Sequence, residues 1–332
     1  MTKNSHVSRL ITSIAMTTYN AAPFLEQQLE SIAKQTQLPD ELVIGDDGSS
    51  DDTLNLIQQF AERLEFPVRV TVNTKRLGSV RNFEETLARC TGEILFLADQ
   101  DDVWTHNKIE IMSRVFDEDP EVGLVFSDAE VIDEKSNSLG FSVWESLRLD
   151  HKAMTRLNQG HAFEVLLKQD VVMGAATAIR ASLFPVARPF NLEWIHDGWV
   201  ATVLASRCKF VAIPDKLIYY RQHRQQQIGV RFNGLYTPSP DYVLDNLEVQ
   251  LQRFKVLLEH LEVNLETTNT SLVLVREKMV HLTFRLRLRK AGLLELHIGI
   301  GELITGRYFR YSWGFRSFLK DVLAVFLVEK AQ

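Results

Sequence analysis

The chain lacks the features that mark secreted and membrane-spanning proteins. Its 332 residues include two cysteines, Cys90 and Cys208, which cannot build a disulfide framework and are expected to be free thiols in a reducing compartment. Residues 1–16 contain neither the long apolar run nor the cleavage site of a signal peptide. The longest apolar runs, such as Val322–Val328, are far too short to span a bilayer. We therefore predict a cytoplasmic protein, with peripheral contact at the inner face of the cell membrane left open.

Low-complexity tracts and internal repeats are also missing, and charge is unevenly distributed along the chain. Residues 276–332 contain eleven Lys and Arg against five Asp and Glu, whereas the rest of the chain contains 26 against 38. The excess of acidic residues in the rest of the chain argues against nucleic acid as a partner. The basic C-terminal part is expected to have a partner of its own.

Apolar runs and helical patterns alternate through the first 130 residues, which is typical of an α/β fold with a parallel sheet and helices on both faces. The predicted strands cover residues 11–16, 41–44, 68–72, 93–97 and 122–126, and short closing strands are predicted at 210–213 and 217–220. From Asp241 the pattern is helical almost to the end. We therefore predict two parts, an α/β domain at residues 1–235 and a helical C-terminal region at residues 236–332.

The most informative motif is LFLADQDDVW, in which an apolar strand ends in Asp99, Asp101 and Asp102. Open α/β sheets bind ligands at the carboxyl ends of their strands. Carboxylates there must be paired, solvated or bound to metal. Oxygen ligands on a tight turn suit Mg²⁺ or Mn²⁺, which share their coordination spheres with phosphate oxygens. Taken alone, the motif could equally be a solvated acidic turn that caps the following helix.

Three more polar clusters follow predicted strands. They are Thr17–Asn20 after the first strand, Gly45–Ser49 after the second, and Leu77–Ser79 with Arg81 and Asn82 further on. Hydroxyl, aromatic and amide groups can hold a nucleobase and its ribose, and a carboxylate can accept the imide N–H of uracil or thymine. Each cluster alone also fits an ordinary polar turn.

Together, the four clusters resemble the family 2 glycosyltransferases of the GT-A fold. The resemblance covers roughly residues 10–230 and is carried by TTYN at Thr17–Asn20, Gln35, DDGSSDDT at Asp46–Thr53, Gly78 with Asn82, and ADQDDVW at Ala98–Trp104. It implies a Rossmann-like, mostly parallel sheet flanked by helices, to which the C-terminal helices are appended. The DQDDVW form and the segment Gly306–Asp321 look most like the bacterial rhamnosyltransferase branch.

The resemblance implies a role for each matching position. The nucleotide-binding residues it implies are Thr17, Tyr19, Asp47, Arg76 (or Arg81), Asn82 and Asp99. Asp101 would bind Mn²⁺ or Mg²⁺ between the two phosphates, and Asp102 is either an alternative ligand or a residue that supports it. In Tyr220-Arg221-Gln222-His223, Arg221 could hold a phosphate and His223 could complete the metal sphere.

The segment Trp194–Trp199 resembles the place where these enzymes keep their catalytic base at the start of a helix. An acceptor hydroxyl must lose a proton as it attacks, and a carboxylate can take it. We predict Asp197 as the general base, with His196 as the second candidate. Without that role, Asp197 would simply cap the helix.

These features predict an inverting, metal-dependent transferase that moves a sugar from an NDP-sugar, dTDP-rhamnose or a UDP-hexose, to a glycan or lipid-linked acceptor in bacterial surface polysaccharide synthesis. A sugar nucleotidyltransferase is an alternative, although Thr17–Pro23 is not the glycine-rich triphosphate loop it would need. A non-catalytic scaffold would not need the acids. Arg and aromatic residues in the C-terminal region suit either a lipid surface or a second subunit, so homo-oligomers are a further prediction.

Overall fold

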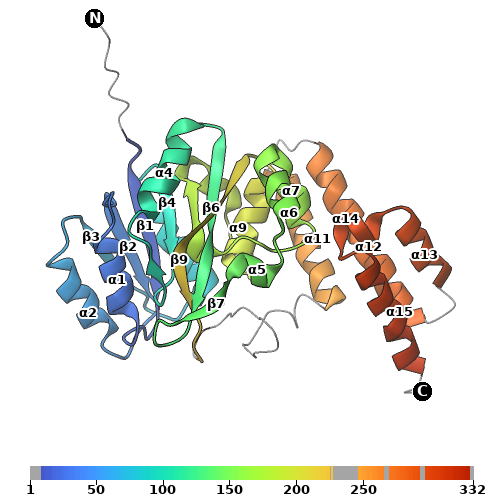
Figure 1. Cartoon of the computed structure of the whole chain (residues 1–332), viewed down its shortest axis with the longest axis horizontal. Coiled ribbons are helices and arrows are strands. Elements are labelled where there is room, and N and C mark those ends of the chain that lie inside the picture. The colour runs from blue at the N-terminus through green and yellow to red at the C-terminus, as the bar shows by residue number, and fades with distance from the viewer. Residues whose placement is uncertain (1–8, 225, 227–245, 265–268, 292–295, 330–332) are drawn as a thin grey trace, which may run out of the picture.

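The computed structural model describes residues 9–224, 226, 246–264, 269–291 and 296–329. The described strands form one mixed sheet, shown in Figure 1, with the order β3-β2-β1-β4-β8-β6-β9-β5 and with β7 paired to β6. Their bounds are β1 Thr12–Thr18, β2 Glu41–Asp46, β3 Val68–Val72, β4 Ile94–Ala98, β5 Val103–Trp104, β6 Val122–Ile132, β7 Ser138–Ser142, β8 Thr177–Arg180 and β9 Lys209–Arg221.

Strands β1 to β4 form the parallel half of the sheet, as the sequence predicts. Strand β8 then pairs antiparallel with both β4 and β6, β6 runs parallel to β9, and β5 and β7 add antiparallel edges. The α/β fold class is confirmed. Two of the strands that pair antiparallel, β7 and β8, come from beyond residue 130, where the regular strand–helix alternation ends.

Alternating side chains of the central strands enter two apolar layers, because successive residues of a strand point to opposite faces. On β1, Ile14 and Met16 join the layer under α1, α2 and α4, whereas Ala15 joins the layer under α3 and α9. On β4, Phe96 and Leu97 divide in the same way. Both faces of the sheet are therefore buried, which explains why these strands read as continuous apolar runs.

The helices and helical turns have the following bounds: α1 Leu25–Ala33, α2 Thr53–Ala61, α3 Ser79–Ala88, α4 Lys108–Glu118, α5 Val143–Leu147, α6 His151–Arg156, η1 Leu157–His161, α7 Ala162–Leu166, η2 Gly174–Ala176, η3 Ala181–Leu183, α8 Phe184–Ala187, α9 His196–Ala205, α11 Leu247–Asn264, α12 Asn269–Ala291, α13 Leu296–Ile304, α14 Arg307–Tyr311 and α15 Phe315–Glu329.

One prediction about the closing strands is wrong. The two short strands expected at 210–213 and 217–220 are one long strand, β9, which pairs with β6 along its whole length. The register jumps from Ser127↔Ile213 to Asp128↔Lys216. Pro214 and Asp215 therefore form a bulge, a place where a residue without a backbone N–H is tolerated. Local sequence shows a break there, but the pairing with β6 carries the strand across it.

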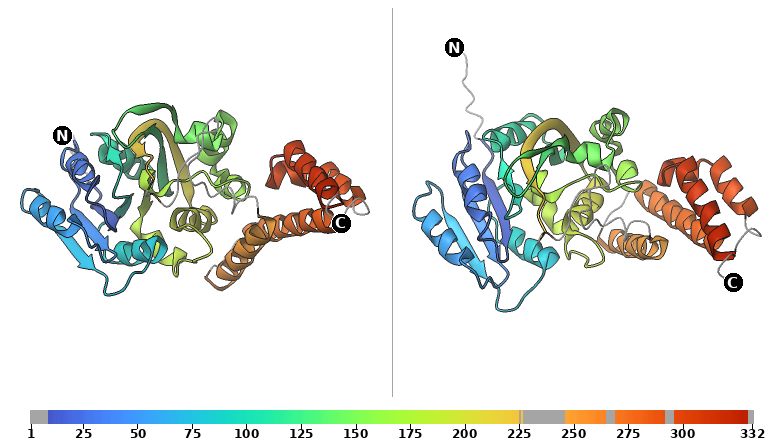
Figure 2. Two further views of the ribbon diagram at one scale, coloured as in Figure 1. Left: turned by 90° about the horizontal axis from the view of Figure 1, so that it is seen from below. Right: turned by 60° about the horizontal axis from the view of Figure 1, so that its bottom comes forward.

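The C-terminal helices gather at the end of the molecule away from β3 and α2, as Figures 1 and 2 show. Phe254, Leu257 and Leu261 of helix α11 are buried in the same layer as α9. The proposed domain boundary falls at residues 227–245, outside the described residues. None of the described helices is long and apolar enough to cross a membrane.

A buried network of charges joins α12 to α15. Asp321 is fully buried and accepts hydrogen bonds from Arg285 Nε at 2.6 Å, Arg289 Nε at 2.6 Å and Tyr308 Oη at 2.9 Å. On its outer face, α15 exposes the stripe Phe315, Leu319 and Leu323. The expected contact of this region with a membrane or a second subunit stays a prediction.

Candidate active site

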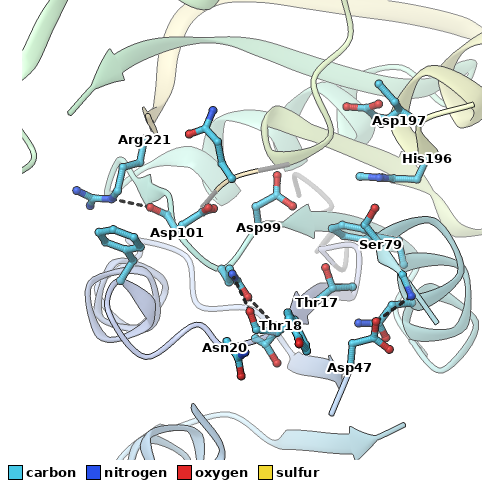
Figure 3. A pocket seen from close by; sticks show the side chains of 18 of the residues that line it. Thr17, Thr18, Asn20, Asp47, Ser79, Asp99, Asp101, His196, Asp197 and Arg221 are labelled. Atoms are coloured by element: carbon cyan, nitrogen blue, oxygen red, sulfur yellow. Dashed lines mark hydrogen bonds between the residues drawn. The ribbon is translucent and has the colours of Figure 1, made fainter. Parts of the chain in front are cut away.

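A pocket of about 480 Å³ lies at the carboxyl ends of β1, β2 and β4 and is closed on one side by the start of α9, as Figure 3 shows. The structure brings nearly all of the predicted site residues to this one pocket. Those that line it are Thr17, Tyr19, Asp47, Arg76, Asn82, Asp99, Asp101, His196, Asp197, Arg221 and His223. The described part of the pocket wall does not include Arg81, which pairs with Glu84 instead, or Asp102.

One end of the pocket has a flat aromatic and cationic surface. The guanidinium of Arg76 lies 3.8 Å from the centre of the Tyr19 ring, a cation–π contact between two pocket residues. Gln100, for which the sequence suggested no role, accepts a hydrogen bond from Tyr19 N at 2.7 Å. The second residue of the DQDD motif thus ties the acidic turn to the aromatic end of the pocket.

Asp47 organises the loop that follows β3. Its carboxylate accepts hydrogen bonds from Leu77 N at 2.7 Å, Gly78 N at 2.8 Å and Asn73 Nδ2 at 3.0 Å. A carboxylate has about four acceptor positions, so one is left for a ligand. Gly78 sits at φ 77°, a conformation that favours glycine, and this allows its N–H to point at Asp47.

Asn82 braces the same corner from α3. It is buried, and its Nδ2 donates to Gly45 O at 2.7 Å while its Oδ1 accepts from Asn73 Nδ2 at 3.0 Å. Its contacts link strand β2 to the loop after β3. The expectation that Asn82 stiffens this wall rests on these two contacts.

The three carboxylates of the DQDD turn lie close together with little compensating charge. Burial, followed by the charges of Asp101 and Asp197, raises the pKa of Asp99 to about 8. Burial and the charges of Asp101 and Asp99 raise the pKa of Asp102 well above its usual range. Lys108 is buried on α4 and its charge opposes both shifts, although burial also lowers the pKa of its own ammonium. No pattern in the sequence indicates that the lysine at the start of this helix is fully buried.

This set of side chains fits a divalent cation, which would relieve the repulsion among the acids. His223 Nε2 lies 2.7 Å from Asp101 Oδ2, so a nitrogen and an oxygen ligand point at one place in the pocket. Among the described residues, no group of three or more His, Cys, Asp or Glu side chains could hold a metal by itself. Mg²⁺ commonly binds one or two carboxylates together with phosphate oxygens, so two protein ligands would suffice when a nucleotide is present.

Asp102 turns away from the pocket. Its Oδ1 accepts a hydrogen bond from Arg221 N at 3.0 Å, and its buried Oδ2 has no hydrogen-bond partner in the described structure. Asp102 therefore supports the end of β9. Of the two predicted roles, this position fits support of the metal ligand, and direct ligation does not fit.

Arg221 lines the pocket and is also held by several groups of the protein, and its predicted contact with a phosphate stays a prediction. Its guanidinium donates to Gln27 Oε1 at 2.6 Å, Asp101 O at 2.8 Å and Ser136 Oγ at 3.0 Å, and also reaches two backbone carbonyls. All three nitrogens of the guanidinium thereby donate within the protein. Arg221 holds the acidic turn and β9 together.

Asp197 lies on a different wall from Asp99 and Asp101, at the start of α9 (Figure 3). Gly174 N donates to its Oδ2 at 2.8 Å, and Gly198 N donates to its Oδ1 at 2.7 Å. Backbone donors of this kind stabilise the ionised carboxylate. Asp197 is thus held in an orientation that faces the acidic cluster across the pocket.

His196, the second candidate base, is less suited to that role. Its ring is stacked on Phe83 with centroids 4.0 Å apart, and neither ring nitrogen has a hydrogen-bond partner in the described structure. Burial lowers the pKa of His196, against the opposing charge of Asp197. The ring nitrogens are enclosed, so they do not face an acceptor directly.

The sheet order and the acids at the strand ends agree with the GT-A type of α/β fold. Solved structures share this fold. TarS of S. aureus, in a crystal structure with UDP-GlcNAc, has 17% sequence identity and a TM-score of 0.55 over 83% of this chain and 73% of its own. The mannosyltransferase PcManGT of Pyrobaculum calidifontis, in complex with GDP-Man and Mn²⁺, has 16% identity and a TM-score of 0.53 over 97% and 87%.

Residues 13–168 match the model of glycosyl transferase family 2. A glycosyltransferase of Nostoc sp. without an assigned function is 26% identical over 212 residues, which are 64% of each chain. The dTDP-rhamnosyl transferase RfbG of Shigella flexneri is 26% identical over 228 residues, or 66% of this chain and 75% of its own. This chain thus spans less than two thirds of the Nostoc relative. The match at residues 13–168 agrees with the predicted family.

Proposed function

We propose that the protein is an inverting glycosyltransferase that moves a sugar from an NDP-sugar to a hydroxyl of a glycan or lipid-linked acceptor. The observation that carries this proposal is the position of Asp197, held by two backbone N–H groups on the wall that faces Asp99 and Asp101. A direct displacement needs the leaving group and the base on opposite sides of the reacting carbon. The pocket provides that separation.

The nucleotide is expected to lie between the Tyr19–Arg76 surface and Asp47. The stacked pair can receive the face of a base, and the remaining acceptor position of Asp47 can bind its imide N–H. Asn82 and Gly78 keep that wall in place. Asp99, which lines the same pocket, is expected to lie near the ribose and the sugar.

Asp101 and His223 are the residues that would hold Mn²⁺ or Mg²⁺. The bound ion would neutralise the charge that develops on the departing nucleoside diphosphate. The protein's own contribution is to keep Asp101 in place, because Arg221 donates a hydrogen bond to the backbone carbonyl of this residue.

Asp197 acts as the general base in the transfer. The acceptor oxygen forms a bond to the anomeric carbon as the bond from that carbon to the phosphate oxygen breaks. The acceptor proton passes to an Asp197 oxygen, and the electron pair leaves with the nucleoside diphosphate. Attack from the face opposite the leaving group inverts the configuration of the anomeric carbon.

The donor is proposed to be dTDP-L-rhamnose or a UDP-hexose, for the synthesis of a bacterial surface polysaccharide. This proposal draws on two relatives, RfbG of Shigella flexneri and the UDP-Glc-dependent glucosyltransferase WfgD of Escherichia coli, which is 26% identical over 126 residues. The pocket leaves both nucleotides open, because dTDP and UDP offer the same imide edge to Asp47.

The test combines nucleotide binding with donor turnover. Wild type is incubated with dTDP-L-rhamnose, UDP-glucose and UDP-GlcNAc, with Mn²⁺ or with EDTA, and the release of nucleoside diphosphate is measured. Melting temperatures with dTDP and UDP report binding separately, because a ligand that binds the native state raises them. We expect Mn²⁺-dependent binding and slow turnover of one donor.

Three variants divide the roles. Asp197→Asn should keep the nucleotide-induced rise in melting temperature and lose turnover by about 10²- to 10⁴-fold, the range for a general base. Asp101→Asn should lose the Mn²⁺-dependent part of binding, and exposed Asp117→Asn on α4 is the control.

Wild type that binds no nucleotide and turns over no donor would refute the proposal and favour a scaffold. Formation of an NDP-sugar from a nucleoside triphosphate would indicate a nucleotidyltransferase.

A further inference from the structure

The segment that carries Asp197 is held from outside by the C-terminal helix α11. Trp194 Nε1 donates to Arg253 O at 3.2 Å, and Arg253 Nε donates in return to Glu193 O at 2.7 Å. The Arg253 guanidinium also lies 4.8 Å from the centre of the Trp194 ring. Two backbone carbonyls, one on each segment, thus receive a donor from the other segment. We call this pair of hydrogen bonds the 193–253 clasp.

Aromatic packing continues the contact on both sides of the clasp. Trp194 meets Phe254 of α11 edge to face at 5.7 Å, and Trp199 of α9 meets His260 of α11 at 4.8 Å. His260 Nε2 also lies 2.9 Å from Val186 O. Helix α11 therefore contacts the chain both before and after Asp197.

The charge of Arg253 also interacts with the acids of this turn. Arg253 is buried, and the charges that oppose its desolvation belong to Asp170, Asp197 and Glu193. Asp170 lies directly under the turn, since a Cβ atom on Gly198 would come within 2.6 Å of its Oδ2. Burial and the charge of Asp197 raise the pKa of Asp170 to about 7, and Arg253 opposes that rise.

We propose that Arg253 is a positioning residue for Asp197, so that α11 is part of the active site of this transferase. The inference rests on the proposed function, because it assigns to Arg253 the placement of the proposed base. The clasp sets the path of the backbone from Glu193 to Asp197, and the guanidinium supplies a positive charge behind the carboxylate. Neither contribution requires Arg253 to touch the substrate.

The experiment compares three α11 variants and one change on the partner segment in the full-length protein. Arg253→Gln removes the charge and the clasp donor, whereas Arg253→Lys retains the charge. Trp194→Phe removes the N–H that reaches Arg253 O and retains an aromatic ring. Lys255→Ala, an exposed position two residues away on α11, is the matched control.

Four readouts are measured for each variant. They are kcat and KM for acceptor-free turnover of the active donor with Mn²⁺, the pH dependence of kcat/KM, the melting-temperature rise with dTDP or UDP, and hydrogen exchange of the peptide that contains residues 193–197. A misplacement near 1 Å can lower a rate by about 100-fold. We expect kcat of Arg253→Gln to fall by about 10- to 100-fold, with donor KM and nucleotide binding unchanged.

The pH profile separates positioning from general stabilisation. Loss of the cation should move the acidic limb of kcat/KM to higher pH in Arg253→Gln, and Arg253→Lys should restore that limb while recovering only part of kcat. Exchange at residues 193–197 should be faster in Arg253→Gln and Trp194→Phe than in Lys255→Ala. A variant that unfolds more easily for merely structural reasons would keep the wild-type limb in its folded fraction.

Two results would overturn the inference. One is that both Arg253 variants keep the wild-type kcat and an unchanged acidic limb of kcat/KM. The other is a parallel loss of nucleotide binding and turnover with unaltered exchange at residues 193–197. If wild type turns over no donor, the proposed function fails, and exchange then decides the clasp alone. Under that outcome, faster exchange supports the clasp, and unchanged exchange refutes it.

Discussion

Gly45 is the position where one added methyl group should disturb both stability and the pocket. It lies on β2 opposite Thr17 of β1, with α3 directly above it. A Cβ atom built on Gly45 would come within 2.1 Å of Thr86 Oγ1 and 2.6 Å of Asn82 Oδ1. Contacts this short cannot exist, so Gly45→Ala must displace α3 or rotate both side chains.

The displacement has two costs. Overpacking a core position typically destabilises by about 1–3 kcal/mol. Movement of Asn82 also breaks its bond to Gly45 O, and an unsatisfied buried amide costs about 1–3 kcal/mol more. Because the two effects overlap in part, we expect Gly45→Ala to lower the free energy of unfolding by about 2–4 kcal/mol.

The same change should weaken nucleotide binding, because Asn82 holds Asn73 and Asn73 holds Asp47. Urea unfolding measures the first effect, and the melting-temperature rise with dTDP or UDP and Mn²⁺ measures the second. Gly301→Ala is the control, since a Cβ there meets nothing within 4 Å on the exposed side of α13. It should be neutral or stabilise by about 0.5–1 kcal/mol.

The reasoning would be refuted if the free energy of unfolding of Gly45→Ala lay within about 0.5 kcal/mol of the wild-type value, because surface substitutions commonly cause changes of that size. Destabilisation with an unchanged nucleotide response would refute only the link from Asn82 to Asp47.

Further predictions concern the C-terminal helices. Asp321→Asn leaves the buried Arg285 without its carboxylate partner and should destabilise by about 3–5 kcal/mol in urea unfolding, without loss of nucleotide binding. Leu257→Ala, at a fully buried position of α11, should cost about 2–5 kcal/mol by the same assay. Burial, followed by the charges of Arg285 and other cations, lowers the pKa of His281 to about 2. Below about pH 6.5 the folded state therefore binds fewer protons than the unfolded state. Stability should therefore fall on acidification by about 1.4 kcal/mol per pH unit from this group, and His281→Gln should remove that slope.

Each of these has a clear contrary result. A loss below 1 kcal/mol in Asp321→Asn would mean that the charges of the network are solvated. Unfolding of Leu257→Ala at the wild-type urea midpoint would mean that α11 is not part of the shared core. Identical pH slopes in wild type and His281→Gln would mean that His281 is protonated in the folded state.

The sequence by itself determined the parallel half of the sheet and the residues that gather at its edge. Continuous apolar runs predict strands buried on both faces, and the carboxyl ends of neighbouring parallel strands meet at one edge. Thr17, Asp47 and Asp99 could therefore be placed together without a structure. The base candidate at Asp197 came only from the family resemblance, because no local pattern brings it to this edge.

Only the tertiary structure decided features that depend on partners distant in sequence. Pairing with β6 carries β9 through Pro214, and the donors of Arg221 are satisfied by groups more than eighty residues away. The burial of Lys108 beside the acids is of the same kind. A side chain's role depends on which groups satisfy it, and that follows from packing between elements that local propensity does not report. The clasp between Arg253 and the Asp197 segment is such a contact, because it joins the C-terminal helices to the proposed catalytic site.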